Sequence, residues 1–345
     1  MTDAHPYLLV CRTPTRAGAG QRATDVIDLP LQREAHTNLP VIYGSTLKGA
    51  LRHATLRKLS RKLDETTAGD LTSAIFGDEP GAEEPSPGVI ALSDATLLAM
   101  PVRCEPGFLA WVTSPYQLGR LYETLELVGG PEALRDAVKS ALDECEELRE
   151  GEALAPEDGE LLLDGNRVRT EASDAVEELA ERLSNAAFQG APEPHFRRYV
   201  RERLVILSDD TLRNLVNSCT ERVVRVQLDE NKTVEEGPWY EERVPEGTIF
   251  FGTINVRYDT TPPQTGVGTR KVLLNGWSPE DVPEGDDRKL QALRKAAEKL
   301  RSGVLRTIAD DESDHHLDLR FQIGGSETVG SGLVRLRLIT QGGRA

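Results

Sequence analysis

Long apolar runs are absent from the 345 residues of this chain. No stretch approaches the ~18 consecutive apolar residues that a membrane-spanning helix requires. The opening segment, MTDAHPYLLVCRTPT, has no basic leader followed by an apolar stretch, so we expect no secretory signal. The four cysteines are widely scattered and form no Cys-x-x-Cys pair, which argues against a zinc site or a disulfide framework. We therefore expect a cytoplasmic protein with reduced thiols and no membrane partner.

Positive charge is also scarce, because 57 acidic residues outnumber 41 lysines and arginines and leave a net charge of −16. This balance excludes indiscriminate binding of nucleic acid over the whole surface. The acids are clustered, however, chiefly in the segment DECEELREGEALAPEDGE. Other stretches are locally basic, including residues 33–61. The chain can therefore carry a cationic surface on an acidic protein.

The N-terminal part of the chain predicts a strand, a long loop and a helix. YLLVCRT (7–13) is short and apolar, as in a strand, and about thirty loop residues with no helical period follow it. The helix begins with Ser45 or Thr46 as its N-cap. Lys48 and Arg52 are four residues apart and so share one of its faces. We expect Gly49 to permit close packing, since glycine is unfavourable in a helix by about 1 kcal/mol relative to alanine.

The remaining elements predict a single α+β domain with an antiparallel sheet. The acidic region of about 131–190 is expected to be a helical insertion, and about 222–245 a hairpin with its turn at DENK. A further helix is predicted over 286–303, and the C-terminal part reads as strand, glycine loop and strand. No linker divides the chain, so the domain covers residues 1–345.

Two segments have the chemistry of a phosphate site. At the helix start, free N–H groups, hydroxyls and cations converge; a merely capped amphipathic helix is the simpler interpretation and the commoner one. The loop GGSETVGSG (324–332) contains four glycines between two strands, which allows backbone N–H groups to approach an anion. It matches neither a P-loop nor a dinucleotide fingerprint, and a plain hairpin turn is its simpler interpretation.

Acidic residues provide the catalytic candidates. Asp28 lies in the long loop and could act as a general base or a metal ligand, although a lone loop aspartate is more often a turn residue. Asp25 is an equal candidate on local grounds. Glu241 and Glu242 form a paired-carboxylate candidate, or simply add solubility to a hairpin face. None of the histidines His36, His53, His195, His315 and His316 has a partner at metal-ligand spacing, so we interpret them as structural or surface residues.

Together these segments resemble a known family. PVIYGSTLKGALRHA is similar to the helix signature of the RAMP superfamily of CRISPR effector proteins, and IGGSETVGSGLVRL to its C-terminal glycine-rich loop. The segments VIDLPLQREAHTNLPVIYG, IFGDE and TVEEGPWYEERVPEGTIFF further resemble the backbone (fourth) subunit of the type III-B (Cmr) effector complex. They occur in the family's order and span most of the chain.

The resemblance implies a modified ferredoxin-like (RRM-like) core with a β-hairpin thumb. It implies that copies of the chain stack as a filament on a guide RNA, together with other Cmr subunits, and cleave complementary target RNA at regular intervals with Mg²⁺ or Mn²⁺. Asp28 matches the acid assigned to cleavage and metal binding, and Glu241 matches a second acid that assists. The RNA-binding positions implied in the same way are Arg16, Ser45, Lys48, Arg52, Gly324, Gly325, Gly330 and Gly332.

One departure from the family pattern leaves alternatives open. The family often has histidine in the stretch TPTHxGxG, where this chain has Arg16, and arginine is a poor general base at neutral pH. This replacement favours a second hypothesis, a scaffold subunit that binds guide RNA without cutting. A guide-processing endoribonuclease and a metabolic anion-binding enzyme are weaker alternatives. The latter predicts a small-molecule pocket and no RNA recovered on purification.

Overall fold

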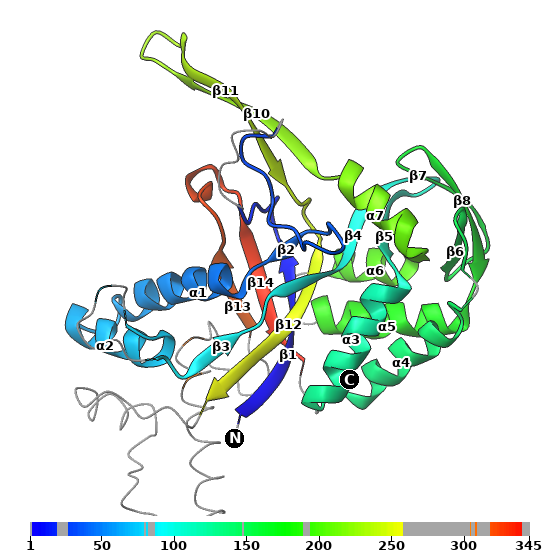
Figure 1. Cartoon of the computed structure of the whole chain (residues 1–345), viewed down its shortest axis with the longest axis horizontal. Helices are drawn as coiled ribbons and strands as arrows, with labels where there is room; N and C mark the ends of the chain where they lie inside the picture. The colour runs from blue at the N-terminus through cyan, green and yellow to red at the C-terminus, as the bar shows by residue number, and fades with distance from the viewer. Residues whose placement is uncertain are drawn as a thin grey trace, which may run out of the picture.

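The computed structural model describes residues 2–18, 27–78, 81, 87–146, 148–188, 194–257, 304, 308 and 318–339. Within these ranges the chain forms helices and strands in no regular alternation (Figure 1). The helices are α1 (Gly44–Leu59), α2 (Glu65–Phe76), α3 (Pro115–Val128), α4 (Glu132–Asp143), α5 (Asp174–Phe188), α6 (Pro194–Arg203) and α7 (Asp209–Ser218). The strands are β1 (Thr2–Cys11), β2 (Val41–Ile42), β3 (Ile90–Leu92), β4 (Ala95–Glu105), β5 (Phe108–Thr113), β6 (Glu152–Ala155), β7 (Gly159–Leu163), β8 (Asn166–Ala172), β9 (Leu204–Leu207), β10 (Glu221–Leu228), β11 (Val234–Arg243), β12 (Ile249–Arg257), β13 (Asp318–Gln322) and β14 (Leu333–Leu338). The prediction of an α+β protein is confirmed.

One sheet organises the fold, with the strand order β13-β14-β1-β12-β4-β5-β9-β6-β8-β7. Its central strands β14, β1, β12 and β4 pair antiparallel, with Leu8 of β1 opposite Phe251 of β12 and Arg337 of β14. The prediction of an antiparallel sheet is wrong for two pairings among the outer strands, because β5 and β9, and likewise β6 and β8, pair in parallel. A long excursion through α3 to α6 separates β5 from β9, and such a crossover allows parallel pairing.

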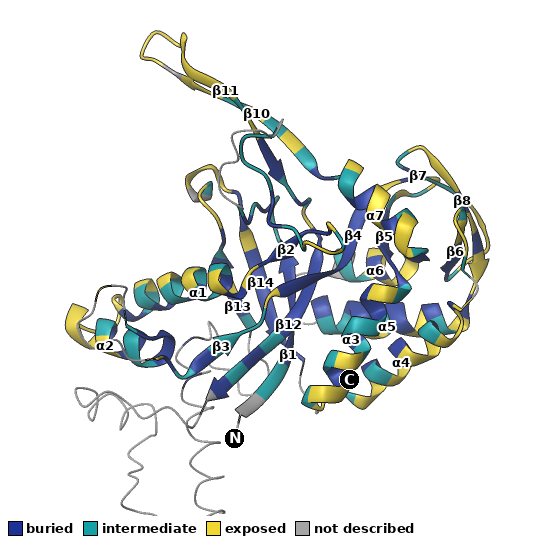
Figure 2. Cartoon of the chain, in the orientation of Figure 1, coloured by how far each residue is buried: buried dark blue, intermediate teal, exposed yellow. Residues whose placement is uncertain are grey.

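The sheet is buried on both faces, which explains the uninterrupted apolar run in β1. Tyr7 and Leu9 contribute to one apolar cluster with residues of α1 and α2. Leu8 and Val10 point to the other face and join a cluster with residues of α3, α4, α5 and α6. In Figure 2 the dark blue of the central strands between these two helical layers marks the core. A shift of β1 by one residue would exchange its two apolar sets between these two clusters.

The acidic insertion is only partly helical. The helical insertion predicted over about 131–190 contains α4 and α5, and between them it also contains the three short strands β6, β7 and β8, which were not predicted. β8 alternates exposed residues with the buried Val168 and Thr170, and its charged residues face solvent. That alternation is the ordinary pattern of a half-buried strand. Its high charge concealed it in the sequence.

The predicted hairpin is present as the two-stranded sheet of β10 and β11, which extends from the body of the molecule (Figure 1). The side chain of Asp229 organises its turn, because Oδ1 accepts hydrogen bonds from the N–H groups of Asn231 (2.9 Å) and Thr233 (2.8 Å). Such Asx contacts are the reason that aspartate favours turns. The helix predicted over 286–303 lies outside the described residues.

Candidate RNA-cleavage site

Asp28 is held against the base of the β10–β11 hairpin. Its Oδ2 atom accepts a hydrogen bond of 2.7 Å from the backbone N–H of Tyr240. The next residue, Leu29, donates its N–H to the carbonyl of Tyr240 (3.0 Å), and its own carbonyl accepts the N–H of Glu242 (3.1 Å). The loop therefore runs beside β11 as a short parallel bridge. Asp28 is half-buried, whereas the competing candidate Asp25 lies outside the described residues.

Glu241 joins three segments that are distant in the sequence. Its carboxylate is buried, with 1 % of the side chain exposed. Oε1 accepts hydrogen bonds from Arg16 Nε (3.1 Å) and Ser326 Oγ (3.0 Å), while Oε2 accepts one from Arg225 Nε. These four residues, which we call the Glu241 cluster, link the first loop, the hairpin strands and the glycine loop.

The electrostatics of the Glu241 cluster keep its carboxylate charged. Burial raises the pKa of Glu241, but the hydrogen bonds of Ser326 and Arg225 and the charges of Arg225 and Arg16 outweigh that effect. The net pKa lies below the ordinary glutamate value, so Glu241 is a carboxylate at neutral pH. A carboxylate that accepts three hydrogen bonds is suited to ordering its neighbours. It is a poor acceptor for a substrate proton, because accepting one would break those bonds.

Glu242 forms an equivalent arrangement on the other side of β11. Its Oε1 accepts hydrogen bonds from Arg33 Nη2 (2.6 Å) and Thr220 Oγ1 (2.8 Å), and Oε2 accepts one from the N–H of Leu31 (3.2 Å). Burial raises the pKa of Glu242, and the charge of Arg33 and these hydrogen bonds more than reverse the shift. This Glu242 cluster fixes the loop three residues beyond Asp28. Sequence reasoning missed Arg33, although two successive acids on a strand must point to opposite sides and each needs a partner when buried.

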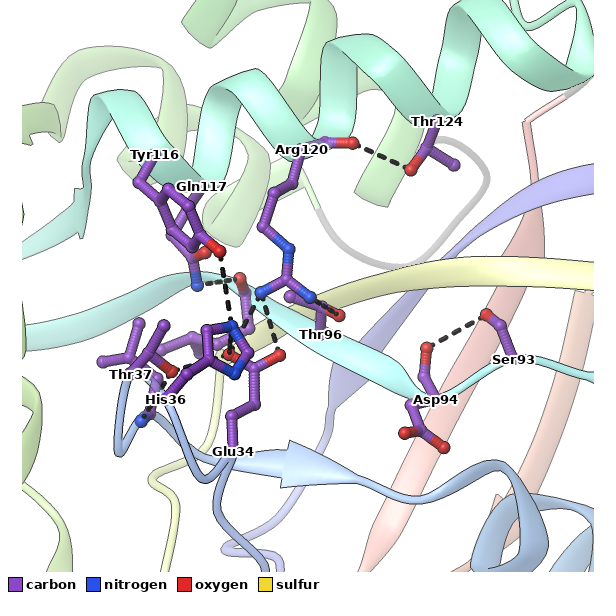
Figure 3. A network of polar contacts seen from close by, with 12 residues as sticks. Glu34, His36, Thr37, Ser93, Asp94, Thr96, Tyr116, Gln117, Arg120 and Thr124 are labelled. Atoms are coloured by element: carbon purple, nitrogen blue, oxygen red, sulfur yellow. Dashed lines mark hydrogen bonds and ion pairs between the residues drawn. The ribbon is translucent and has the colours of Figure 1, made fainter.

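The far end of the loop is anchored to α3, as Figure 3 shows. Arg120 donates from Nη1 to both carboxylate oxygens of Glu34 (2.8 and 3.0 Å) and from Nη2 to Thr96 Oγ1 (3.1 Å). Tyr116 places its hydroxyl 3.3 Å from His36 Nε2. Contacts at Asp28, Leu31, Arg33 and Glu34 thus hold the segment that carries the candidate acid at several points.

The start of α1 differs from the prediction. Its N-cap is Tyr43, and neither Ser45 nor Thr46 caps the helix with its side chain. Side chains from other parts of the chain accept hydrogen bonds from the first N–H groups instead: Tyr43 N–H donates to Gln32 Oε1 (2.8 Å) and Gly44 N–H donates to Asp94 Oδ1 (2.7 Å). Gln32 also donates to Thr46 Oγ1 (2.9 Å), which ties the Asp28 loop to α1. Ser45 itself is exposed.

The predicted cations of α1 are Lys48 and Arg52. Arg52 donates to the carbonyl of Gly77 at the end of α2, and Lys48 is half-buried on the same side of the helix. The expectation for Gly49 is wrong, because a Cβ atom built there would meet no atom within 4 Å. Close packing is required instead at Gly44, where an added Cβ would lie 2.4 Å from the carbonyl oxygen of Leu92.

The glycine loop packs on the first loop, and its glycines serve different purposes. Gly324 has φ +93°, and an added Cβ would lie 2.3 Å from the carbonyl oxygen of Arg16. Gly332 has φ +82°, and its N–H donates to the carbonyl of Pro14 (3.0 Å). Gly325 lies beside the Arg16 guanidinium, while Gly330, at φ +78°, is open. The structure therefore brings Arg16 and the glycine loop together at the base of the hairpin.

Within the described ranges, no three His, Cys, Asp or Glu side chains cluster closely enough to form a metal site of their own. Asp28 presents one carboxylate, with Oδ2 engaged by Tyr240 N–H. This donor set fits Mg²⁺, which retains several waters and is usually held by one or two carboxylates together with substrate phosphates. It does not fit a structural zinc site, which requires four nitrogen or sulfur ligands.

Comparison with known proteins gives the family. The family model of the RAMP superfamily matches residues 8–335, and the chain therefore belongs to this superfamily. A curated relative from Pyrococcus furiosus, named CRISPR system Cmr endoribonuclease Cmr4, is 31 % identical over 94 % of this chain and 92 % of its own.

Solved structures agree with this assignment. The crystal structure of oligomeric Cmr4 from Pyrococcus furiosus has a TM-score of 0.58 at 28 % identity, over 98 % of this chain and 99 % of that one. A subunit of the type III-B Cmr-beta complex bound to cognate target RNA shares the fold, with a TM-score of 0.63 at 21 % identity over 97 % of both chains. Within the described residues no helix is long and apolar enough to cross a bilayer.

Proposed function

We propose that this chain is the backbone subunit of a type III-B CRISPR effector complex. In this proposal, copies of the chain stack along a guide RNA in the cytoplasm, beside other Cmr subunits, and cleave complementary target RNA at regular intervals. The single observation that supports it most strongly is the match over 94 % of the chain to a relative named as a Cmr endoribonuclease. The oligomeric state of the homologous crystal structure supports the stacking of copies.

Asp28 is the proposed catalytic residue. Among the described residues its Oδ1 atom has no hydrogen-bond partner, while Oδ2 is fixed by Tyr240 N–H. One carboxylate oxygen is thus oriented by the protein and the other is available to RNA. Attack by a 2′-hydroxyl on its own phosphate requires in-line geometry more than a strong nucleophile. Asp28 would accept the hydroxyl proton or hold the divalent ion, and the products would be a 2′,3′-cyclic phosphate and a 5′-hydroxyl.

A bound Mg²⁺ or Mn²⁺ would neutralise charge that develops on the phosphate. The chain contributes Asp28 as its ligand, and the carboxylate stays ordered by the bridge to β11 without the metal. We assign Glu241 a positioning role beside Asp28 rather than proton transfer, because its oxygens are engaged by Arg16, Arg225 and Ser326. The hairpin would act as the thumb that distorts the guide–target duplex.

Guide binding is proposed for the glycine loop and α1. Backbone N–H groups of the loop and the cations Arg16, Lys48 and Arg52 would contact phosphates, so that sequence choice is left to base pairing. The position of Arg16 beside the glycine loop supports its role. Ser45 is exposed at the helix start and would add a hydroxyl contact.

We also propose that the core is a modified ferredoxin-like domain that covers the whole chain, with insertions at about 131–190 and 222–245. The antiparallel order β14-β1-β12-β4 supports this proposal. If the core strands β1, β4, β12 and β14 are counted along the chain, their order across the sheet is fourth, first, third, second. This is the strand order of a βαββαβ fold in which α1 is the first helix. The second helix would fall between β12 and β14.

Reconstitution tests the proposal against the scaffold alternative, which the Arg16 replacement favours. The complex is assembled with a labelled guide and supplied with complementary or non-complementary RNA in Mg²⁺. Evenly spaced cuts that require both the guide and complementarity are expected. Binding of target without cutting would identify a scaffold, and absence of guide binding would refute the assignment itself.

A further inference from the structure

Arg225, on β10 at the base of the hairpin, is held by only one edge of its guanidinium group. Its Nε atom donates to Glu241 Oε2, and its terminal atoms Nη1 and Nη2 have no hydrogen-bond partner among the described residues. The Arg225 side chain is 25 % exposed, whereas the glutamate that holds it is 1 % exposed. A buried carboxylate thus orients the arginine and leaves two of its donor groups open to solvent.

Arg225 and Asp28 are bound to adjacent residues of β11. In the hairpin Arg225 stands opposite Trp239, and its side chain crosses to β11 to reach Glu241, two residues further along. Asp28 is bound to the backbone of Tyr240 at the other edge of β11. Because neighbouring strands lie only about 4.8 Å apart, the guanidinium group points across β11 toward the edge that carries the candidate acid.

The other cation of the Glu241 cluster is less available. A Cβ atom added at Gly18 would lie 2.6 Å from Arg16 Nη1, and one added at Gly325 would lie 3.5 Å from Arg16 Nη2. The terminal nitrogens of Arg16 therefore lie against the first loop and the glycine loop. Arg225 is the cation of this cluster whose terminal nitrogens are open on the hairpin, the element that the proposed function places against the guide–target duplex.

We propose that Arg225 is a second catalytic residue, which donates from its terminal nitrogens to the non-bridging oxygens of the scissile phosphate. In the cleavage step the 2′-oxygen forms a bond to phosphorus, and the bond from phosphorus to the 5′-oxygen breaks. The hydroxyl proton passes to Asp28 or to water, and the 5′-oxygen takes a proton from water. Negative charge grows on the non-bridging oxygens during the attack, and a guanidinium group already oriented by Glu241 stabilises that charge. The inference rests on the proposed function and adds the residue that stabilises this charge.

Single-turnover cleavage by the reconstituted complex, with target bound at saturation, compares Arg225→Lys and Arg225→Gln with wild type. Lysine keeps a positive charge beside Glu241, but its compact ammonium group cannot bind this glutamate and a phosphate as the two edges of a guanidinium group do. We expect both variants to cut at least about 100-fold more slowly, which is the loss typical of one preorganised donor. Their affinities for guide and target should stay near wild type. Wild-type cutting by Arg225→Lys would overturn the proposal, because Arg225 would then only balance the charge of Glu241.

The matched control is Arg222→Gln, which removes the same charge from the same strand. Arg222 is exposed and lies on the opposite face from Arg225, since successive strand residues alternate between faces. Its Nη2 atom donates only a long hydrogen bond of 3.4 Å to the carbonyl of Asn217. The control should cut like wild type. An equal loss of rate in Arg222→Gln and Arg225→Gln would overturn the proposal, whereas failure of the wild type to cut would refute the proposed function instead.

A phosphorothioate target gives a second readout that does not depend on the variants. One cut site carries sulfur at a single non-bridging oxygen, and the neighbouring cut sites serve as internal controls. We expect one of the two diastereomers to be cut on the order of 10-fold more slowly by the wild type, as for the loss of one hydrogen bond to a charged group. Mn²⁺ should not restore that rate, because a guanidinium group and not the metal contacts the oxygen. Equal cutting of both diastereomers, or full restoration of both by Mn²⁺, would overturn the proposal even if neither Arg225 variant assembles.

Discussion

The substitutions Glu241→Gln and Glu242→Gln form a matched pair that separates the two clusters at the base of the hairpin. The residues are adjacent, and their side chains are 1 % and 3 % exposed. Glutamine keeps the shape and one acceptor oxygen but removes the charge that balances Arg16 and Arg225, or Arg33. Removing one member of a buried ion pair costs about 3–5 kcal/mol. Because these arginines are 16–25 % exposed, we expect smaller losses than for a fully buried pair, about 2–3 kcal/mol, in urea unfolding.

The functional effects should differ between the two variants. Glu241 holds Arg16 and Ser326, so Glu241→Gln should loosen the glycine loop and weaken guide binding. Glu242 holds Leu31 and Arg33, so Glu242→Gln should leave guide affinity near wild type. The same change should slow target cleavage by about 10- to 100-fold, since misplacement of a catalytic group by ~1 Å costs about that much.

Two assays measure these effects on the reconstituted complex: guide affinity by filter binding, and single-turnover cleavage with target bound at saturation. The reasoning is refuted if both variants have the wild-type free energy of unfolding and the wild-type cleavage rate. It is equally refuted if Glu242→Gln weakens guide binding while the cleavage rate of the bound target stays unchanged.

The other predictions concern pH, glycines and metal. Because the pKa values of Glu241 and Glu242 lie below the ordinary glutamate value, the stability that these residues contribute is complete above about pH 4.3. It is lost as the pH falls through the lowered pKa values of the folded state. Thermal melts should therefore show a melting temperature that falls with pH in this acid range, and the double glutamine variant should show a smaller fall. Gly49→Ala should raise the free energy of unfolding by about 0.5–1 kcal/mol, because its helical position is open. Gly44→Ala should lower the free energy of unfolding, because the added Cβ would contact the Leu92 carbonyl. Urea titration measures both values, and a Gly44→Ala variant more stable than Gly49→Ala would contradict this prediction. Gly324→Ala should weaken guide binding in the filter assay, because it forces the loop away from the first loop; unchanged affinity would contradict the assigned path. Chelation by EDTA should abolish cleavage and leave guide binding intact, and cleavage that survives chelation would exclude a metal role for Asp28.

Elements with a strong local signal could be predicted from the sequence. The apolar run of β1, the Asp229 turn and the strand–glycine loop–strand pattern were all anticipated, because burial and turn chemistry act over a few residues. The parallel pairing of β5 with β9 could not be predicted, since it depends on where a long excursion returns to the sheet. The start of α1 was missed for a related reason. Gln32 and Asp94, distant in sequence, occupy its N–H groups in place of a local cap.

In the candidate site, too, local features could be predicted from the sequence and contacts between distant residues could not. Asp28 is a catalytic candidate because of its family motif, and the structure adds the hydrogen bond that orients it. The ion pairs of Glu241 with Arg16 and of Glu242 with Arg33 join positions more than 200 residues apart. No local sequence pattern predicts such ion pairs. Only the requirement that buried acids have partners shows that they must exist.

The most direct test of the central claim is the single-turnover rate of target cleavage by Asp28→Asn in the reconstituted complex. Asparagine can keep the hydrogen bond to Tyr240 N–H but carries no charge for a metal or a proton. The matched control is Asp158→Asn, since Asp158 likewise accepts a backbone N–H bond, from Ala172 at 2.7 Å, in a different part of the chain. The account predicts that Asp28→Asn binds guide and target like wild type and loses evenly spaced cutting by at least about 100-fold. The control should cut normally. Wild-type cutting by Asp28→Asn would contradict the account and move the catalytic role to another residue.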